Sequence, residues 1–283
     1  MKRSIRILLS LVAVIALVIC VLCCLYIVQY IRGDRLNVTL SGIAAFSDPS
    51  ESESLPSSLP ESEQVTEPLP ESEPSEPESD PDALPTIESV IDFDELEAVN
   101  PDIYAWIEIP SLGTSLAVLQ SPDNDEFYLR HAATGAYYSG GSIFSQRYNT
   151  KTFEDPMTVL YGHNYKTMVG PLNRLADADD FEVCDVIRIY TRERVFEYSV
   201  FAAFPYSNRH LLFLYDFNDP ASFEEFFASL DDVPGGNFRR ELFPESGDRV
   251  LTLSTCIIGN RMRRFLVSGV LTAEYQVVPA VSE

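Results

Sequence analysis

The sequence is short of cysteine and of positive charge. Only five of its 283 residues are cysteine, and three of these lie in one apolar run near the N-terminus, which leaves Cys184 and Cys256 for the rest of the chain. A small extracellular domain stabilised by disulfides usually carries more. Lysine and arginine number 20 against 43 aspartate and glutamate residues, which gives a formal net charge of −23. Nucleic-acid binding needs a basic face, and the sequence has none of the necessary size, so we expect no nucleic-acid partner.

Histidine and glycine-rich motifs are scarce as well. The three histidines, His131, His163 and His210, are far apart in the chain, and no cysteine or histidine spacing of the zinc type occurs. No glycine-rich phosphate-binding loop is found either. We therefore expect neither a metal ion nor a nucleotide cofactor.

Apolar residues dominate the N-terminal region from 7 to 28. About 20 apolar residues are enough for a helix to span a bilayer. Because Lys2, Arg3 and Arg6 precede the run, the positive-inside rule predicts a cytoplasmic segment 1–6, a single transmembrane anchor 7–28 in the lipid bilayer, and an extracellular remainder. A cleaved signal peptide is the alternative. The length of the run and the absence of a convincing cleavage site after it favour the anchor.

A segment rich in Ser, Pro and Glu follows the anchor. Between residues 47 and 82 every charged residue is Asp or Glu. Such a stretch buries too little apolar surface to offset its ordering entropy, and its prolines and like charges extend it. We predict an extracellular disordered linker over 29–85. The pentapeptide Leu-Pro-Glu-Ser-Glu, found at 59–63 and 69–73, is interpreted as spacer sequence rather than a recognition motif.

Residues 86–275 have the composition of one globular domain, and 276–283 are expected to form a C-terminal tail. Short apolar or alternating segments, separated by Gly, Pro and Asn, predict a mainly β domain with a closed or nearly closed β-barrel. The expected strands are 104–109, 115–119, 141–145, 158–161, 186–191, 195–204, 249–254 and 264–272.

Two helices are predicted beside these strands. The first covers 88–99 and is acidic near its start. The second follows Asp219, a good N-cap, with Pro220 at the first helical position. One apolar stripe on it consists of Phe223, Phe226, Phe227 and Leu230. We expect this stripe to pack against the barrel as part of the core.

The chemistry centres on Cys256, which stands at the end of a predicted strand with the basic residues Arg261, Arg263 and Arg264 downstream. A thiol is a useful nucleophile as its thiolate, which nearby cations stabilise. His163 lies in a turn-like string elsewhere in the domain. Singly, each residue type is ordinary: a packing cysteine, a turn histidine, a surface arginine. Together they are the parts that acyl transfer by a thiol requires.

The other cysteine of the domain is expected to be structural. Cys184 lies in the strand-like segment 181–190, where a half-buried packing role is predicted. A disulfide between Cys184 and Cys256 would remove the nucleophile, so we expect both thiols to be free.

These motifs resemble the sortases, the membrane-anchored transpeptidases of Gram-positive bacteria. Residues 252–256, Thr-Leu-Ser-Thr-Cys, match the TLxTC signature of the family. Residues 161–164 match its histidine loop, and 264–267 match its arginine-led final strand. Similarity to class B in particular extends over the segments 100–110, 120–131 and 141–144 and the helix before the cysteine strand.

The resemblance implies an eight-stranded barrel and a two-step reaction. Cys256 would be the nucleophile, His163 the general acid, and Arg264 the donor to the oxyanion or substrate carbonyl, with Arg261 and Arg263 as alternatives to Arg264. The enzyme would cleave a C-terminal sorting signal after Thr, as a thioacyl enzyme, and transfer the protein to an amine. An Asn-Pro-x-Thr or Leu-Pro-x-Thr-Gly-like signal is implied, with an amine of the peptidoglycan precursor as acceptor.

The resemblance also assigns residues for substrate contact. Ser254 and Thr255 stand next to the nucleophile, and Asn124 and Leu129 are similar to groove positions of class B enzymes. The residues that follow the cysteine are apolar, so the sequence shows no acidic partner for His163.

Two alternatives remain open from the sequence. One is a sortase of the same class that polymerises pilins and takes a pilin lysine as its acceptor. The other belongs to a different class: a membrane-tethered β-barrel that binds wall or partner proteins and in which Cys256 is only structural.

Overall fold

The computed structural model describes residues 12, 14–25, 27–28, 84–88, 91–165, 168–257 and 259–278. Within these residues, 14–25 are helical and exposed, and none of the described helices has both the length and the apolar character needed to cross a bilayer. The predicted cytoplasmic segment 1–6, part of the predicted anchor 7–28 and nearly all of the predicted linker 29–85 lie outside the described residues.

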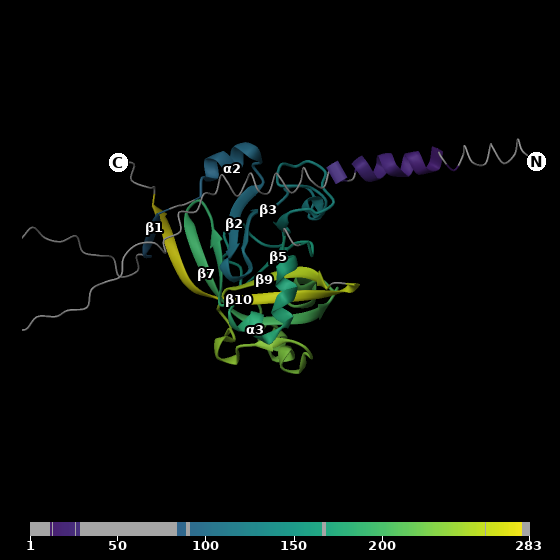
Figure 1. Cartoon of the computed structure of the whole chain (residues 1–283). Coiled ribbons are helices and arrows are strands. Elements are labelled where there is room, and N and C mark those ends of the chain that lie inside the picture. Colours follow the sequence, from purple (N-terminus) through teal and green to yellow (C-terminus); the bar gives the residue numbers. More distant parts are fainter. Residues whose placement is uncertain are drawn as a thin grey trace, which may run out of the picture.

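Eight strands close into a β-barrel (Figure 1). In spatial order they are β10 (Asn260–Val278), β9 (Val250–Ile257), β5 (Met157–Tyr161), β4 (Ile143–Ser145), β3 (Thr114–Leu119), β2 (Ile103–Ile109), β6 (Val186–Tyr190) and β7 (Arg194–Ser207). Antiparallel pairing of β7 with β10 closes the ring. The predicted mainly β fold and eight-stranded barrel are thereby confirmed, and each predicted strand corresponds to one barrel strand.

Two further short strands lie outside the ring. β1 (Thr86–Glu88) pairs in parallel with the end of β10, and β8 (Asn237–Phe238) pairs with β7. Pairing with β1 carries β10 to Val278, so the expected C-terminal tail 276–283 begins three residues too early. Neither strand was predicted: β8 has only two residues, too few to show an alternating pattern, and the three residues of β1 are all exposed.

The first helix is shorter than predicted. α2 (Phe93–Val99) begins after Asp92, whose carboxylate accepts a hydrogen bond of 2.9 Å from the backbone N–H of Glu95. The predicted range 88–99 started too early because Glu88 belongs to β1. Apart from α5 (Pro220–Ala228), the other helices of the domain are short: η2 (Pro110–Leu112), η3 (Phe127–Leu129), η4 (Gly170–Ala176), α3 (Ala178–Glu182), α4 (Leu211–Leu214), η5 (Ser229–Asp232) and η6 (Arg240–Leu242).

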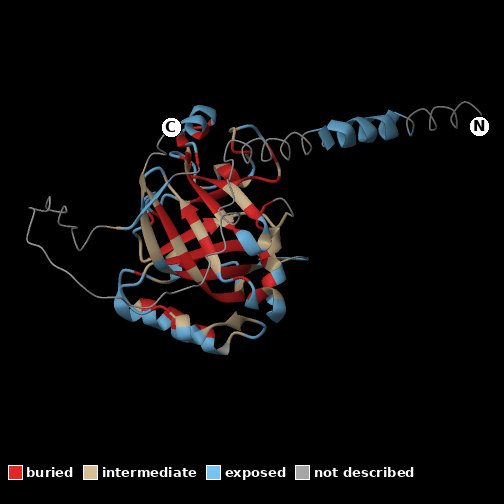
Figure 2. Cartoon of the chain, turned by 60° about the vertical axis from the view of Figure 1, so that its left-hand side comes forward, coloured by how far each residue is buried: buried red, intermediate tan, exposed pale blue. Residues whose placement is uncertain are grey.

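The helix α5 (Pro220–Ala228) starts where the sequence predicts. The carboxylate of Asp219 accepts from the backbone N–H of Ala221 at 3.3 Å and caps the helix. The four residues of the apolar stripe are all buried, and they pack in one cluster with side chains of β5, β7, β9 and β10. In Figure 2 the helical segments beside the barrel are red (buried) on the side that faces the barrel and pale blue (exposed) on the outer side. The stripe is core, as predicted.

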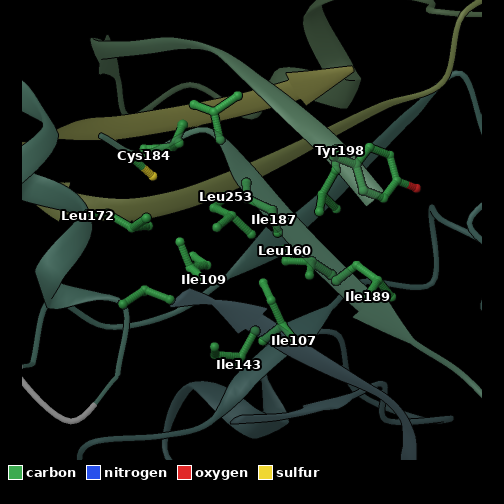
Figure 3. Packing of buried hydrophobic residues seen from close by; sticks show 14 of the residues in the cluster. Ile107, Ile109, Ile143, Leu160, Leu172, Cys184, Ile187, Ile189, Tyr198 and Leu253 are labelled. Atoms are coloured by element: carbon green, nitrogen blue, oxygen red, sulfur yellow. The ribbon is translucent and has the colours of Figure 1, made fainter. Parts of the chain in front are cut away.

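The barrel interior is filled by apolar side chains from strands on all sides (Figure 3). Along β6 the side chains alternate, with Ile187 and Ile189 fully buried and Arg188 and Tyr190 partly exposed. Successive residues of a strand point to opposite faces, so this alternation places the two isoleucines in the core. The packed interior gives the strands fixed positions.

The expectation for Cys184 needs a correction. Cys184 lies in the turn between α3 and β6 rather than in a strand, and it is fully buried rather than half-buried. Asp177 caps α3 by accepting from the backbone N–H of Asp179 at 3.0 Å, and the helix includes the first two residues of the segment 181–190 that was predicted to be strand-like. The sulfur of Cys184 points into the core in Figure 3. Both cysteines of the domain are free thiols, as predicted.

A carboxylate shared by two arginines provides a test of barrel stability. Glu274 on β10 is 11% exposed and accepts from Arg194 Nη1 at 2.6 Å and from Arg249 Nη2. Burial raises the pKa of Glu274, but the hydrogen bonds from Arg249 and Arg194 outweigh it, and the pKa lies below its ordinary value. A depressed folded-state pKa stabilises the protein above the unfolded pKa, and this stabilisation is lost as pH falls through the folded pKa.

We predict that Glu274→Gln lowers the free energy of unfolding by about 1–3 kcal/mol at pH 7, and that the difference from wild type shrinks on acidification. Urea denaturation followed by the fluorescence of Trp106, the single tryptophan and fully buried, measures both. Glu224→Gln on the exposed face of α5 is the control and is expected to change little. A difference that is independent of pH would contradict the prediction.

Candidate active site

One groove brings together the three residues predicted to carry the chemistry. Cys256 on β9, His163 after β5 and Arg264 on β10 all line a groove of about 850 Å³. This volume is within the usual range for ligand sites. The groove lies where β9 ends, so residues from three strands meet around the end of the cysteine strand.

The register of β9 and β10 decides which arginine faces the cysteine. Arg264 stands directly opposite Cys256 in the antiparallel pair. Residues directly opposite each other point to the same face of a sheet, whereas the next residue points to the other. Arg263 is exposed and is not among the described groove residues. The side chain of Arg261 is not described. The geometry therefore favours Arg264 over Arg263.

The parallel pairing of β5 with β9 places His163. Tyr161, the last residue of β5, is opposite Ser254, so the chain leaves β5 close to Cys256. His163 Nε2 lies 2.8 Å from the carbonyl oxygen of Leu129. Because a carbonyl oxygen only accepts hydrogen bonds, Nε2 carries the proton, and Nδ1 is the nitrogen left for proton exchange. The partner of the histidine is thus a main-chain oxygen rather than an acid.

Three of the four residues predicted to contact substrate reach the groove. Leu129, Ser254 and Thr255 line it. The hydroxyl of Thr255 is buried and makes no hydrogen bond within the described part of the chain. Asn124 is not among the described groove residues. Its side-chain oxygen accepts from the backbone N–H of Glu126 at 3.0 Å and shapes the turn before η3.

A second histidine, which the sequence did not single out, also lines the groove. His210 Nε2 lies 2.6 Å from Gln146 Oε1, and its ring stacks on Phe213 with centroids 4.0 Å apart. Burial lowers the pKa of His210, while the charge of Asp125 raises it to a smaller extent. The neutral form is therefore favoured, which suits His210 poorly to the role of proton donor.

Two asparagines were also not predicted. The side-chain amides of Asn164 and Asn173 both donate to the carbonyl oxygen of Cys256. Their one signal in the sequence is that Asn164 follows His163 directly. Nothing in the sequence marks Asn173.

The groove is more positive than the chain as a whole. Its charged lining consists of Arg130, Arg209 and Arg264 against the single acid Glu126, within the described residues. Burial raises the pKa of Tyr161, and the charge of Arg264 offsets part of this rise. Positive charge at such a site stabilises an oxyanion that forms there.

A β-barrel that gathers a thiol, an imidazole and a guanidinium in one groove has the components of a thiol-dependent acyl-transfer site. Residues 107–272, more than half of the chain, match the sortase domain family model. The chain belongs to the sortase family, and its relatives make it a class B-like sortase.

Three similar proteins illustrate this relationship. Sortase B of Listeria monocytogenes is 30% identical over 164 residues, which cover 57% of this chain and 65% of that protein. The chain therefore matches slightly less than two thirds of that relative's length. Sortase B of Staphylococcus aureus is 26% identical over 167 residues, 58% of this chain and 67% of that protein. The structure of Clostridium perfringens sortase B superposes with a TM-score of 0.57 at 25% identity, covering 64% of this chain and 100% of that one.

The two thiols of the domain should react at different rates. Burial raises the pKa of Cys184, and the hydrogen bond with Ser111 and the charge of Arg239 offset only part of this. Cys256 is half-buried in the groove. At a pH well below the pKa of a thiol, each unit by which that pKa rises lowers the thiolate fraction about tenfold. We predict that iodoacetamide at pH 7 modifies Cys256 much faster than Cys184, measured by mass spectrometry of the separate peptides. Equal rates in the folded protein would show that the core around Cys184 opens readily.

Proposed function

We propose that this protein is a cysteine transpeptidase that cleaves a C-terminal sorting signal after Thr and transfers the protein to a cell-wall amine. The observation that carries this proposal is the meeting of Cys256, His163 and Arg264 in one groove. Membership of the sortase family and the similarity to class B relatives support the type of reaction.

The first step forms a thioester. The thiolate of Cys256 attacks the carbonyl carbon of the Thr residue, and the electron pair of the carbonyl bond moves to oxygen. Arg264 donates hydrogen bonds to this oxyanion. As the carbonyl re-forms, the carbon–nitrogen bond breaks and His163 gives a proton to the leaving amine. The products are a thioacyl enzyme, neutral His163 and the released C-terminal peptide.

The second step releases the enzyme. The acceptor amine attacks the thioester carbon and gives a proton to neutral His163. The carbon–sulfur bond then breaks, and Cys256 leaves as the thiolate. One amide bond is exchanged for another and one proton returns to His163, so the reaction balances without an external energy source.

The substrates follow the class B resemblance. We propose a sorting signal of the Asn-Pro-x-Thr or Leu-Pro-x-Thr-Gly-like type, and an amine of the peptidoglycan precursor as acceptor. A pilin lysine is the alternative acceptor. We also propose that residues 7–28 anchor the protein in the cell membrane by a single span, with 1–6 in the cytoplasm and the linker 29–85 holding the domain outside.

The proposal is tested with the full chain in detergent and a library of sorting-signal peptides, with and without candidate amines, followed by mass spectrometry. We predict that Cys256→Ala lowers cleavage and transfer by about 10³-fold or more, because Cys256 is the one thiol among the described residues that line the groove. Cys184→Ala is the matched control and should retain activity. The preferred amine distinguishes a wall acceptor from a lysine acceptor.

Two results of this experiment would contradict the proposal. If Cys256→Ala cleaves as well as wild type, Cys256 is not the nucleophile. If neither protein acts on any peptide, the non-catalytic binding module is the better interpretation.

The arginine assignment has its own test. We predict that Arg264→Lys lowers kcat/KM about 10²-fold or more, because an ammonium group does not reproduce the bidentate hydrogen bonding of guanidinium to an oxyanion. Arg263→Lys, one residue away and outside the groove, should be nearly neutral. The assignment is wrong if the two variants exchange these effects in the same peptide assay.

A further inference from the structure

The backbone carbonyl of the candidate nucleophile is held by two side chains. Asn164 Nδ2 donates to the carbonyl oxygen of Cys256 at 2.9 Å, and Asn173 Nδ2 donates to the same atom at 3.3 Å. Both donors come from the chain that follows His163, one from its loop and one from η4. The two amides therefore link the histidine segment to the cysteine strand.

The position of Asn164 continues the parallel ladder between β5 and β9. The backbone N–H of Gly162 donates to the carbonyl of Ser254 at 3.1 Å. In a parallel pair the next such bond comes two residues further along both strands. That bond would join the backbone N–H of residue 164 to the carbonyl of Cys256. The side-chain amide of Asn164 makes this bond in its place.

Because a side-chain amide replaces the backbone donor, the chain can leave the sheet after β5 while the carbonyl of Cys256 on β9 keeps its hydrogen bond. His163 lies between the last backbone donor and Asn164, and its ring turns to the carbonyl of Leu129. On the other side of Cys256, the pairing of β9 with β10 is irregular between Asn260 and Arg264. The end of β9 therefore lacks a regular ladder beyond Cys256 on that side, and the amides fix it from the side of β5.

The loop that carries Asn164 is itself closed tightly. The backbone N–H groups of Met168 and Gly170 both donate to the carbonyl of Tyr165 at 3.0 Å. A Cβ atom at Gly170 would lie 2.5 Å from that carbonyl oxygen and 3.0 Å from Asn164 Oδ1. Only glycine leaves room for this packing, which places the amide of Asn164 in a defined orientation.

We propose that Asn164, assisted by Asn173, is a positioning residue that fixes the Cys256 backbone relative to His163 for transpeptidation. The inference rests on the proposed function, because it concerns the geometry of the same thiol and imidazole. Its physical basis is that small displacements of reacting groups cost rate: about 1 Å can cost 10²-fold. Loss of the link should therefore affect turnover more than peptide binding.

The test compares Asn164→Ala, Asn173→Ala and the double variant in the full chain with the preferred sorting peptide. For Asn164→Ala we expect kcat to fall about 10- to 100-fold while KM stays within about twofold. Asn173→Ala, which loses the longer bond, should show a smaller fall. Asn164→Asp keeps the shape but has no N–H to donate, so it should not restore kcat.

The matched control is Asn237→Ala. Asn237 is half-buried, and its amide donates to the carbonyl of Leu175 at 2.8 Å, so the same kind of bond is lost without a contact to Cys256. Thermal unfolding of all variants measures the structural cost. The positioning role predicts that Asn164→Ala loses kcat far beyond Asn237→Ala at a similar change in melting temperature.

A second measurement works without a sorting peptide. The rate of Cys256 alkylation against pH reports the environment of the thiol, and we expect its profile to shift in Asn164→Ala and not in Asn237→Ala. If Asn164→Ala matches Asn237→Ala in both kcat and alkylation profile, the inference is overturned. If Asn164→Ala does not fold, an unchanged Asn173→Ala overturns it. Failure of wild type on every peptide, with the alkylation shift present, rejects the proposed function and leaves the link between Asn164 and Cys256 supported.

Discussion

The parallel pairing of β5 with β9 is the constraint on which the candidate site depends. Parallel strands end at the same edge of a sheet, so the residue after β5 and the residue at the end of β9 come together, although His163 and Cys256 are far apart in the sequence. β10 then runs antiparallel to β9 and brings Arg264 opposite Cys256. Three adjacent strands thus place a thiol, an imidazole and a guanidinium around one strand end.

Barrel closure holds these three strands in place. β10 continues for 19 residues and pairs with both β9 and β7, so displacement of the arginine strand would disturb two ladders at once. The interior cluster includes residues from β5, β9 and β10, such as Leu160, Leu253 and Phe265. Sites carried on packed strands hold reacting groups more accurately than sites on loops. His163 is the one member on a loop, and side-chain and main-chain hydrogen bonds compensate for this.

Strands, the start of a helix and motif residues could be predicted from the sequence, whereas contacts that depend on a single hydrogen bond could not. Short apolar or alternating segments marked all eight barrel strands, and the Asp219–Pro220 pair marked the start of α5. Cys256, His163 and Arg264 were recognisable because a family motif surrounds each. The partner of His163 was not, because every residue has a carbonyl oxygen and no residue type identifies the one that Leu129 supplies.

The role of Asn164 was hidden for a related reason. Asparagine in a turn usually bonds its own neighbouring backbone, and nothing in the sequence shows that this amide instead reaches a strand more than ninety residues away. Such a bond appears only once the register of β5 and β9 is known. The overall charge is likewise a poor guide to the site. Much of the net charge of −23 lies in the acidic linker, whereas the groove collects Arg130, Arg209 and Arg264 from three separate segments. In a strongly acidic chain the groove is thus lined by more positive than negative charge, because topology rather than composition selects the groups that meet there.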